Sequence, residues 1–131
     1  MKKDIEFPEN TKVTMAIAPT ELDQWDVFLI NNGDQILKNV LAATTGYGFD
    51  KVGNKISTST LRHFFDEIEA NSIQLVEKID PSVFGLHNEY WVSYWIEGKL
   101  YDRKFIFVPE SITNQNCIFV KALGKEAVLH S

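Results

Sequence analysis

The stretch Glu89–Pro109, EYWVSYWIEGKLYDRKFIFVP, contains two of the three tryptophans and three of the four tyrosines of the 131-residue chain. Two runs rich in β-branched and aromatic residues flank the segment Glu97–Leu100. Such runs favour strands, and glycine at the first central position of a two-residue loop suits a type II′ turn. The pattern predicts a long β-hairpin with Gly98-Lys99 as its loop, in which Trp95 pairs with Asp102.

Side chains alternate along a strand, so this pairing divides the hairpin into two faces. The more apolar face, which we expect to pack on the core, carries Tyr90, Val92, Tyr94, Ile96, Tyr101, Arg103, Phe105 and Phe107. The other face carries Trp91, Ser93, Trp95, Glu97, Leu100, Asp102, Lys104 and Ile106. Arg103 is expected to stack on an aromatic ring or to extend its guanidinium group to the surface.

Trp91, Trp95 and Ile106 on the second face form the candidate binding surface. The two tryptophans lie roughly 13 Å apart at about 3.3 Å per residue, and aromatic anchors dominate many protein interfaces. The sequence allows three alternatives for what covers this surface: another segment of the same chain, a protein partner or second copy, and a small ligand.

Composition indicates one globular domain over residues 1–131, with a polar N-terminal arm at residues 1–10. Hydrophobic residues make up 44% of the chain and charged residues 24%, which is ordinary for a domain that buries its own core. A net charge of −5 without a Lys/Arg cluster argues against a nucleic-acid partner.

The sequence shows no apolar run of about 18 residues and no apolar segment after its first lysines, so no membrane partner and no secretory signal are expected. The single cysteine, Cys117, excludes an intrachain disulfide and fits a reducing compartment. We therefore expect a cytoplasmic protein, with Cys117 as a small buried residue of a strand.

Alternating polarity predicts further strands at residues 11–18, 25–30, 36–44, 72–79 and 117–123. Asn31–Asp34 is a strong turn signal, although it leaves open whether its flanking strands form a hairpin or cross between sheets. Asp80–Gly85 is typical of an N-capped helical turn with proline at its first position. The sum is an all-β antiparallel sandwich of seven or eight strands, followed after Gly124 by a tail.

Two segments are harder to interpret. Gly46–Asn54 lacks the spacing of a phosphate-binding loop and is expected to be a connecting loop. Within Ser57–Ser72, an i, i+3, i+4, i+7 stripe would suit a helix, whereas alternation would suit a strand. We favour the strand because it is consistent with a sandwich. The helix stripe consists of Leu61, Phe64, Phe65 and Ile68.

Candidate chemistry centres on histidine. His63, His87 and His130 are too widely spaced to suggest a metal pair, and no cofactor is expected. His63 could share a helix face with Glu67, and a hydroxyl of Thr58–Thr60 beside it would resemble a nucleophile–base pair. No third group completes that pair, so catalysis remains an alternative: a small hydrolase or ligand-binding enzyme, with His63 or His87 meeting a hydroxyl or carboxylate in a concave pocket.

Two resemblances add to this interpretation. One is to immunoglobulin-like sandwich modules and implies that fold; it is carried by Leu29, Asn31, Gly33, Asp34, Leu37, Asn39 and Val40. With the turn of Asp80–Gly85, the expected fold is an immunoglobulin-like sandwich with a short helical turn near Pro81. The other is to small uncharacterised bacterial proteins, some labelled phenylalanyl-tRNA synthetase alpha subunit; it is carried by Val27–Asn31, Gly46–Gly48, Ser59–Phe64, Val83–Glu89 and Tyr101–Phe107. The arginine-bearing ATP motif of a class II synthetase does not map onto these residues, so the resemblance implies no functional residue.

We therefore expect a non-catalytic protein-interaction or assembly module that binds a protein partner or its own copy. A carbohydrate-binding sandwich that uses Trp91 and Trp95 is the third alternative, and it would require an extracellular location.

Overall fold

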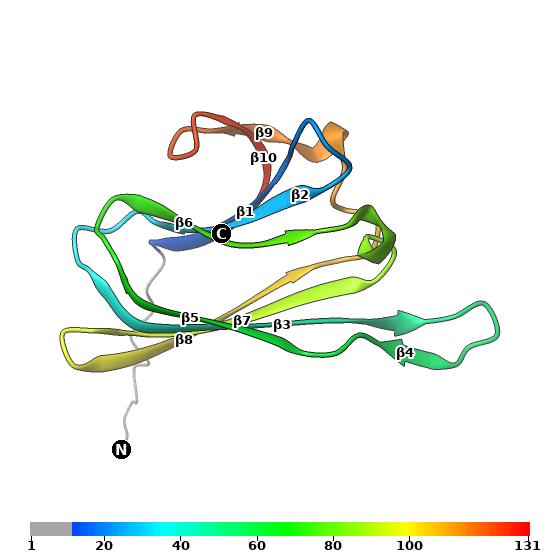
Figure 1. Cartoon of the computed structure of the whole chain (residues 1–131), viewed down its shortest axis with the longest axis horizontal. Coiled ribbons are helices and arrows are strands. Elements are labelled where there is room, and N and C mark those ends of the chain that lie inside the picture. The colour runs from blue at the N-terminus through cyan, green and yellow to red at the C-terminus, as the bar shows by residue number, and fades with distance from the viewer. Residues whose placement is uncertain (1–11) are drawn as a thin grey trace, which may run out of the picture.

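Residues 12–131, which the computed structural model describes, form two antiparallel β-sheets packed face to face (Figure 1). The expected N-terminal arm at residues 1–10 lies outside this range. The first sheet has the spatial order β6 (Ser72–Ile79), β2 (Trp25–Asn31), β1 (Val13–Pro19), β10 (Lys125–His130) and β9 (Ile118–Val120). In the second sheet β3 (Leu37–Phe49) pairs on one side with β7 (His87–Ile96), which pairs with β8 (Lys99–Phe107), and on the other side with β4 (Lys55–Ser57) and β5 (Leu61–Ile68).

The all-β antiparallel prediction is confirmed. The described residues contain ten strands and two short 3₁₀ turns, η1 (Pro81–Val83) and η2 (Asn114–Asn116), rather than seven or eight strands. The helical turn near Pro81 is confirmed: the Asp80 carboxylate accepts a hydrogen bond from the Ser82 amide at 2.8 Å. Hydrogen bonds from Ser82 lower the pKa of Asp80.

The hairpin of β7 and β8 is present, but its loop is Glu97-Gly98 and Trp95 pairs with Leu100. Glu97 and Gly98 have φ values of 48° and 78°, and positive φ at both central positions is the mark of a type I′ turn. The predicted register was wrong by two residues. Because a shift of two keeps each side chain on its face, the predicted core and outer faces are nevertheless confirmed by burial.

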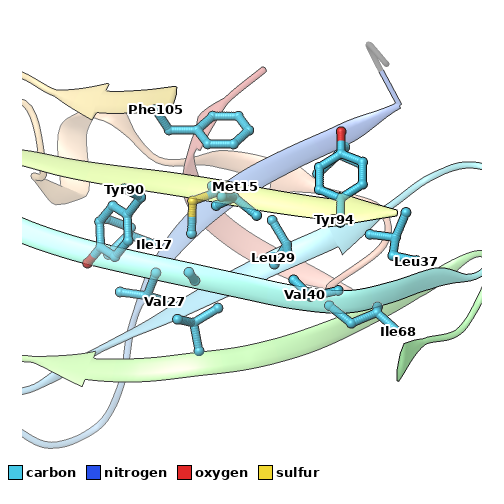
Figure 2. Packing of buried hydrophobic residues seen from close by; sticks show 14 of the residues in the cluster. Met15, Ile17, Val27, Leu29, Leu37, Val40, Ile68, Tyr90, Tyr94 and Phe105 are labelled. Carbon is cyan, nitrogen blue, oxygen red and sulfur yellow. The ribbon is translucent and has the colours of Figure 1, made fainter. Parts of the chain in front are cut away.

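The core lies between the two sheets (Figure 2). Tyr90, Tyr94 and Phe105 from the hairpin are fully buried there against apolar side chains of β1 and β2 that include Met15 and Leu29. Arg103, on the core side of β8, stacks over the Phe105 ring at 4.7 Å and donates a hydrogen bond to the Val13 carbonyl at 2.8 Å. The guanidinium group is thus satisfied at the edge of the core.

The turn after Asn31 crosses between the sheets and does not close a hairpin, since β2 and β3 belong to different sheets. Asn31 is buried, and its amide donates to the carbonyl oxygens of Gln35 at 2.8 Å and Glu69 at 3.0 Å. Its side-chain oxygen accepts from the Gly33 amide at 3.0 Å. One buried side chain therefore fixes the crossing.

The expected loop over Gly46–Asn54 was wrong in its first half, because Gly46–Phe49 continue β3 and pair with β4 and β7. Leu86 lies over this part of the strand: a Cβ added at Gly46 or Gly48 would stand 3.2 or 3.1 Å from its side chain. The glycines thus permit a close approach and do not mark a loop. Only residues 50–54 form the turn.

Of three further predictions, one is confirmed and two are wrong. Ser57–Ser72 contains the strand β5, as favoured, and no helix. The expected tail after Gly124 is instead β10, which lies between β1 and β9 and buries Ala127 and Val128. Cys117 is half-buried just after η2, outside any strand, and burial raises the pKa of its thiol.

Candidate functional site

The outer face of the second sheet carries large apolar side chains that no described segment covers. We call this set the aromatic face; it comprises Leu41, Phe64, Trp91, Trp95 and Leu100, which are 38%, 58%, 49%, 40% and 50% exposed. Within residues 12–131, therefore, the first of the three possible occupants, another segment of the same chain, does not cover the tryptophans.

Strand register fixes how these side chains lie, because residues directly opposite each other on antiparallel strands share a face. Three rows cross the sheet: Arg62, Ala43, Trp91 and Lys104; Phe64, Leu41, Ser93 and Asp102; and Glu67, Lys38, Trp95 and Leu100. The Lys104 ammonium stands 4.9 Å from the centroid of the Trp91 ring. The face is therefore a strip of apolar side chains with charges of both signs at its margins.

Ile106 lies on the same side of β8 as Lys104, opposite Glu89, and is half-buried. It extends the aromatic face beyond Trp91. At the opposite end, beside Trp95, the surface is hollowed by about 390 Å³ between the turn that enters β3 and the hairpin loop. The predicted residues Trp91, Trp95 and Ile106 therefore share one exposed face.

A second site lies at the edge of the core, where the carboxylate of Glu77 meets His63 and Tyr90. Glu77 Oε1 is 2.8 Å from His63 Nε2, and the Tyr90 hydroxyl donates to Glu77 Oε2 at 2.8 Å. The Glu77 side chain is only 8% exposed and that of His63 is 28% exposed. Because β6 belongs to the first sheet and β5 and β7 to the second, these bonds join the two sheets.

Burial and the neighbouring Glu77 carboxylate raise the pKa of Tyr90 above its ordinary value. The phenol therefore remains a hydrogen-bond donor to Glu77 throughout the neutral and mildly alkaline range.

Beside Glu77 a cavity of about 230 Å³ opens between the sheets. Its walls are mostly apolar and also include hydroxyl groups and the Asn88 amide group; they comprise Thr44, Gly46, Thr58, Ser59, Leu61, Glu77, Ile79, Val83 and Asn88. The Asn88 amide group donates to the Val83 and Leu86 carbonyl oxygens at 3.0 and 3.1 Å. Thr58 Oγ1 accepts from the Gly46 amide at 2.8 Å, so both polar groups also hold the cavity wall in place.

The structure separates the other candidate residues of the histidine hypothesis. His63 pairs with Glu77 on the facing sheet and not with Glu67, because the helical spacing of that pair does not apply to a strand. His87 stacks on Tyr47 with ring centroids 5.0 Å apart. His130 packs edge-on against Phe105 and Phe107. Within residues 12–131, His63 is the only histidine that pairs with a carboxylate, and that carboxylate, Glu77, lines the cavity.

Across residues 12–131, no three His, Cys, Asp or Glu side chains gather as a metal site would require. In the same part of the chain, no helix is both long and apolar enough to span a bilayer.

Comparison of the chain with models of known families, with curated proteins and with solved structures finds no match. The two resemblances drawn from the sequence therefore stay predictions.

Sequence reasoning missed Glu77 because a bulge reverses its direction. Val27 pairs with Glu77 and Phe28 with Leu75, so Val76 is an extra residue in β6. In a regular strand Glu77 would lie on the same outer face as Leu75, two residues before it. No feature of a single strand shows such a bulge, because it exists only relative to the partner strand.

Proposed function

We propose that this protein is a non-catalytic interaction module that assembles with a second copy of itself through the aromatic face. The observation that carries the proposal is the exposure of two tryptophans, 49% for Trp91 and 40% for Trp95, on one face of one sheet. Contiguous apolar patches of this kind are uncommon on monomers and mark interaction sites.

The side-chain chemistry of the face supports a protein partner. Tryptophan contributes a large contact area and is enriched among the residues that dominate binding energy. Leu41 and Phe64 widen the strip across β3 and β5, so a partner could cover both indoles together. If the sheet of a partner packed on this face, the two sheets would lie about 10 Å apart, as the two layers of a sandwich do.

A second copy suits the charges at the margins. Arg62 and Lys104 stand at the two ends of the row that contains Trp91, and Asp102 ends the neighbouring row. In a two-fold arrangement the same patch meets itself, so that acidic groups of one copy can approach basic groups of the other. A face with a single sign of charge would repel its own copy.

For the fold we propose the finer class of an immunoglobulin-like sandwich. The strand order supports it: β6-β2-β1 in one sheet and β5-β3-β7-β8 in the other match the orders E-B-A and C′-C-F-G of that fold. The β7–β8 hairpin would then be F–G. β9 and β10 extend the first sheet beyond this pattern.

Sedimentation velocity over a range of protein concentrations tests the assembly. The wild-type chain is expected to associate reversibly, and the double variant Trp91→Ser/Trp95→Ser to remain monomeric with its fold intact by circular dichroism. Ile73→Ser/Leu75→Ser is the matched control, because those side chains are 39% and 41% exposed on the opposite sheet. It should associate as the wild type does.

Two outcomes would contradict the proposal. One is a wild-type chain that stays monomeric up to about 1 mM, where the corresponding binding energy is only about 4 kcal/mol. The other is equal association of the tryptophan variant and the wild type.

A further inference from the structure

Glu77 is turned into the protein by a local device. The extra residue Val76 lets Glu77 lie opposite Val27, which is fully buried, while Leu75 stays on the outer face at 41% exposure. Bulges commonly redirect a side chain next to a functional site. Burying a carboxylate costs free energy unless it is paired, so the inward direction of Glu77 requires compensating interactions.

The contacts within residues 12–131 leave part of the carboxylate's hydrogen-bonding capacity unused. An ionised carboxylate can accept about four hydrogen bonds, and His63 and Tyr90 provide one to each oxygen. Neither is a permanent cation: tyrosine is neutral here, and histidine is charged only when protonated. A further donor that carries positive charge would suit the site.

The cavity beside Glu77 limits the size and shape of such a ligand. Its volume of about 230 Å³ is below the roughly 300 Å³ at which pockets for drug-sized ligands begin. Leu61, Ile79 and Val83 line it with apolar surface, and Thr44 and Ser59 add hydroxyl groups. The occupant should therefore be small, with an apolar body and one polar end.

We propose that this cavity binds a short-chain primary ammonium compound. The ammonium group donates to Glu77 and to a wall hydroxyl, and the alkyl chain contacts Leu61, Ile79 and Val83. An ammonium group has three donors and no acceptor, which matches a carboxylate that only accepts. This site is separate from the aromatic face and independent of self-association.

The test is an NMR titration of the ¹⁵N-labelled full chain with n-butylammonium, and with n-butanol and butyrate as probes of the same chain length. Tiny ligands bind weakly, so the titration extends to about 100 mM. We expect saturable shifts of the amides of Thr58, Leu61, Ile79 and Val83 with butylammonium, weaker ones with butanol and none with butyrate at these amides.

Variants separate the carboxylate's role from general stability. Glu77→Gln is nearly isosteric and should weaken butylammonium binding about tenfold or more, because a charge-assisted hydrogen bond is lost. Leu61→Lys adds a positive charge at a position that is 55% exposed, leaves the buried cluster in place and should also weaken binding. Glu67→Gln is the control. Glu67 lies on β5, as Leu61 does, but is exposed, so this variant should bind butylammonium as the wild type does.

The inference is overturned if butyrate shifts the cavity amides as strongly as butylammonium does, or if no probe gives saturable shifts there. Unchanged affinity in both Glu77→Gln and Leu61→Lys would overturn it as well. If Glu77→Gln does not fold, Leu61→Lys decides the outcome alone.

Discussion

Glu77 and Trp91 reverse the usual distribution of residue types between the inside and the surface of a protein. The carboxylate side chain is 8% exposed, whereas the tryptophan is 49% exposed. Buried charges and exposed large apolar groups are the informative exceptions in a folded chain. Here each has an identifiable local cause: a bulge at Val76 for Glu77, and regular alternation along β7 for Trp91.

Tyr94 gives a pH-dependent prediction at the residue scale. Burial raises its pKa to about 12, against about 10 in an unfolded chain. Between these values the native state holds more protons than the unfolded state, so the free energy of unfolding falls as the pH rises through that window. The loss from this residue should be on the order of 2 kcal/mol by pH 12.

Tyr94→Phe should remove that contribution, so that its stability falls less between pH 10 and 12 than that of the wild type. Urea denaturation at pH 8 and at closely spaced values above pH 10 measures the difference. Parallel curves for the two proteins would show that Tyr94 does not contribute to the alkaline loss of stability.

At the scale of the element, the hairpin loop depends on Gly98. Its φ of 78° lies in the left-handed region, which costs an L-residue about 1–2 kcal/mol. Gly98→Ala should lower the free energy of unfolding by about that amount in a chemical denaturation experiment. Gly85→Ala is the matched control, since Gly85 has no positive φ and an added Cβ would make only an ordinary contact at 3.5 Å. Equal losses in both variants would contradict the turn assignment.

The packing of the C-terminal end of β3 depends on the close contact between Gly48 and Leu86. An added Cβ would lie 3.1 Å from Leu86 Cδ2, which is too close without a local shift. Gly48→Ala should destabilise the chain by about 1–3 kcal/mol, as overpacking does. Leu86→Ala in the same chain should recover part of that loss, which a double-mutant cycle measures as a coupling energy. Strictly additive effects would show that Leu86 does not restrict the strand.

The hairpin shows how far local sequence determines an element. Alternation of Trp91, Val92 and Tyr94 predicted both faces, because each strand has a single period. The register was missed because Glu97 and Gly98 both adopt positive φ, and a non-glycine residue in that region is not apparent from its letter. The glycines of β3 predict a loop when the sequence is considered alone, because Leu86, whose close approach requires them, is distant in sequence.

At the scale of the whole molecule, the features that sequence could not supply are those set by pairing between distant segments. β10 joins the first sheet by pairing with β1, more than a hundred residues earlier. The Glu77 cavity needs residues from both sheets, among them Ile79 of β6 and Leu61 of β5. The aromatic face, by contrast, could be predicted in part, since Trp91 and Trp95 lie on one strand.

Within residues 12–131 both tryptophans of the aromatic face are open to solvent, and the third, Trp25, is half-buried against the core and packs edge-on to Phe84 with ring centroids 5.5 Å apart. Self-association through the aromatic face should therefore protect two of the three indoles. Quenching of tryptophan fluorescence by a neutral quencher such as acrylamide measures this protection directly.

The most direct test is acrylamide quenching of tryptophan fluorescence as the protein concentration rises from about 1 μM to about 1 mM, the range of weak to moderate affinities. We expect the quenching constant of the wild type to fall as copies associate, and that of Trp91→Ser/Trp95→Ser, which reports Trp25 alone, to stay constant. A wild-type quenching constant that does not change over this range would contradict assembly through the aromatic face.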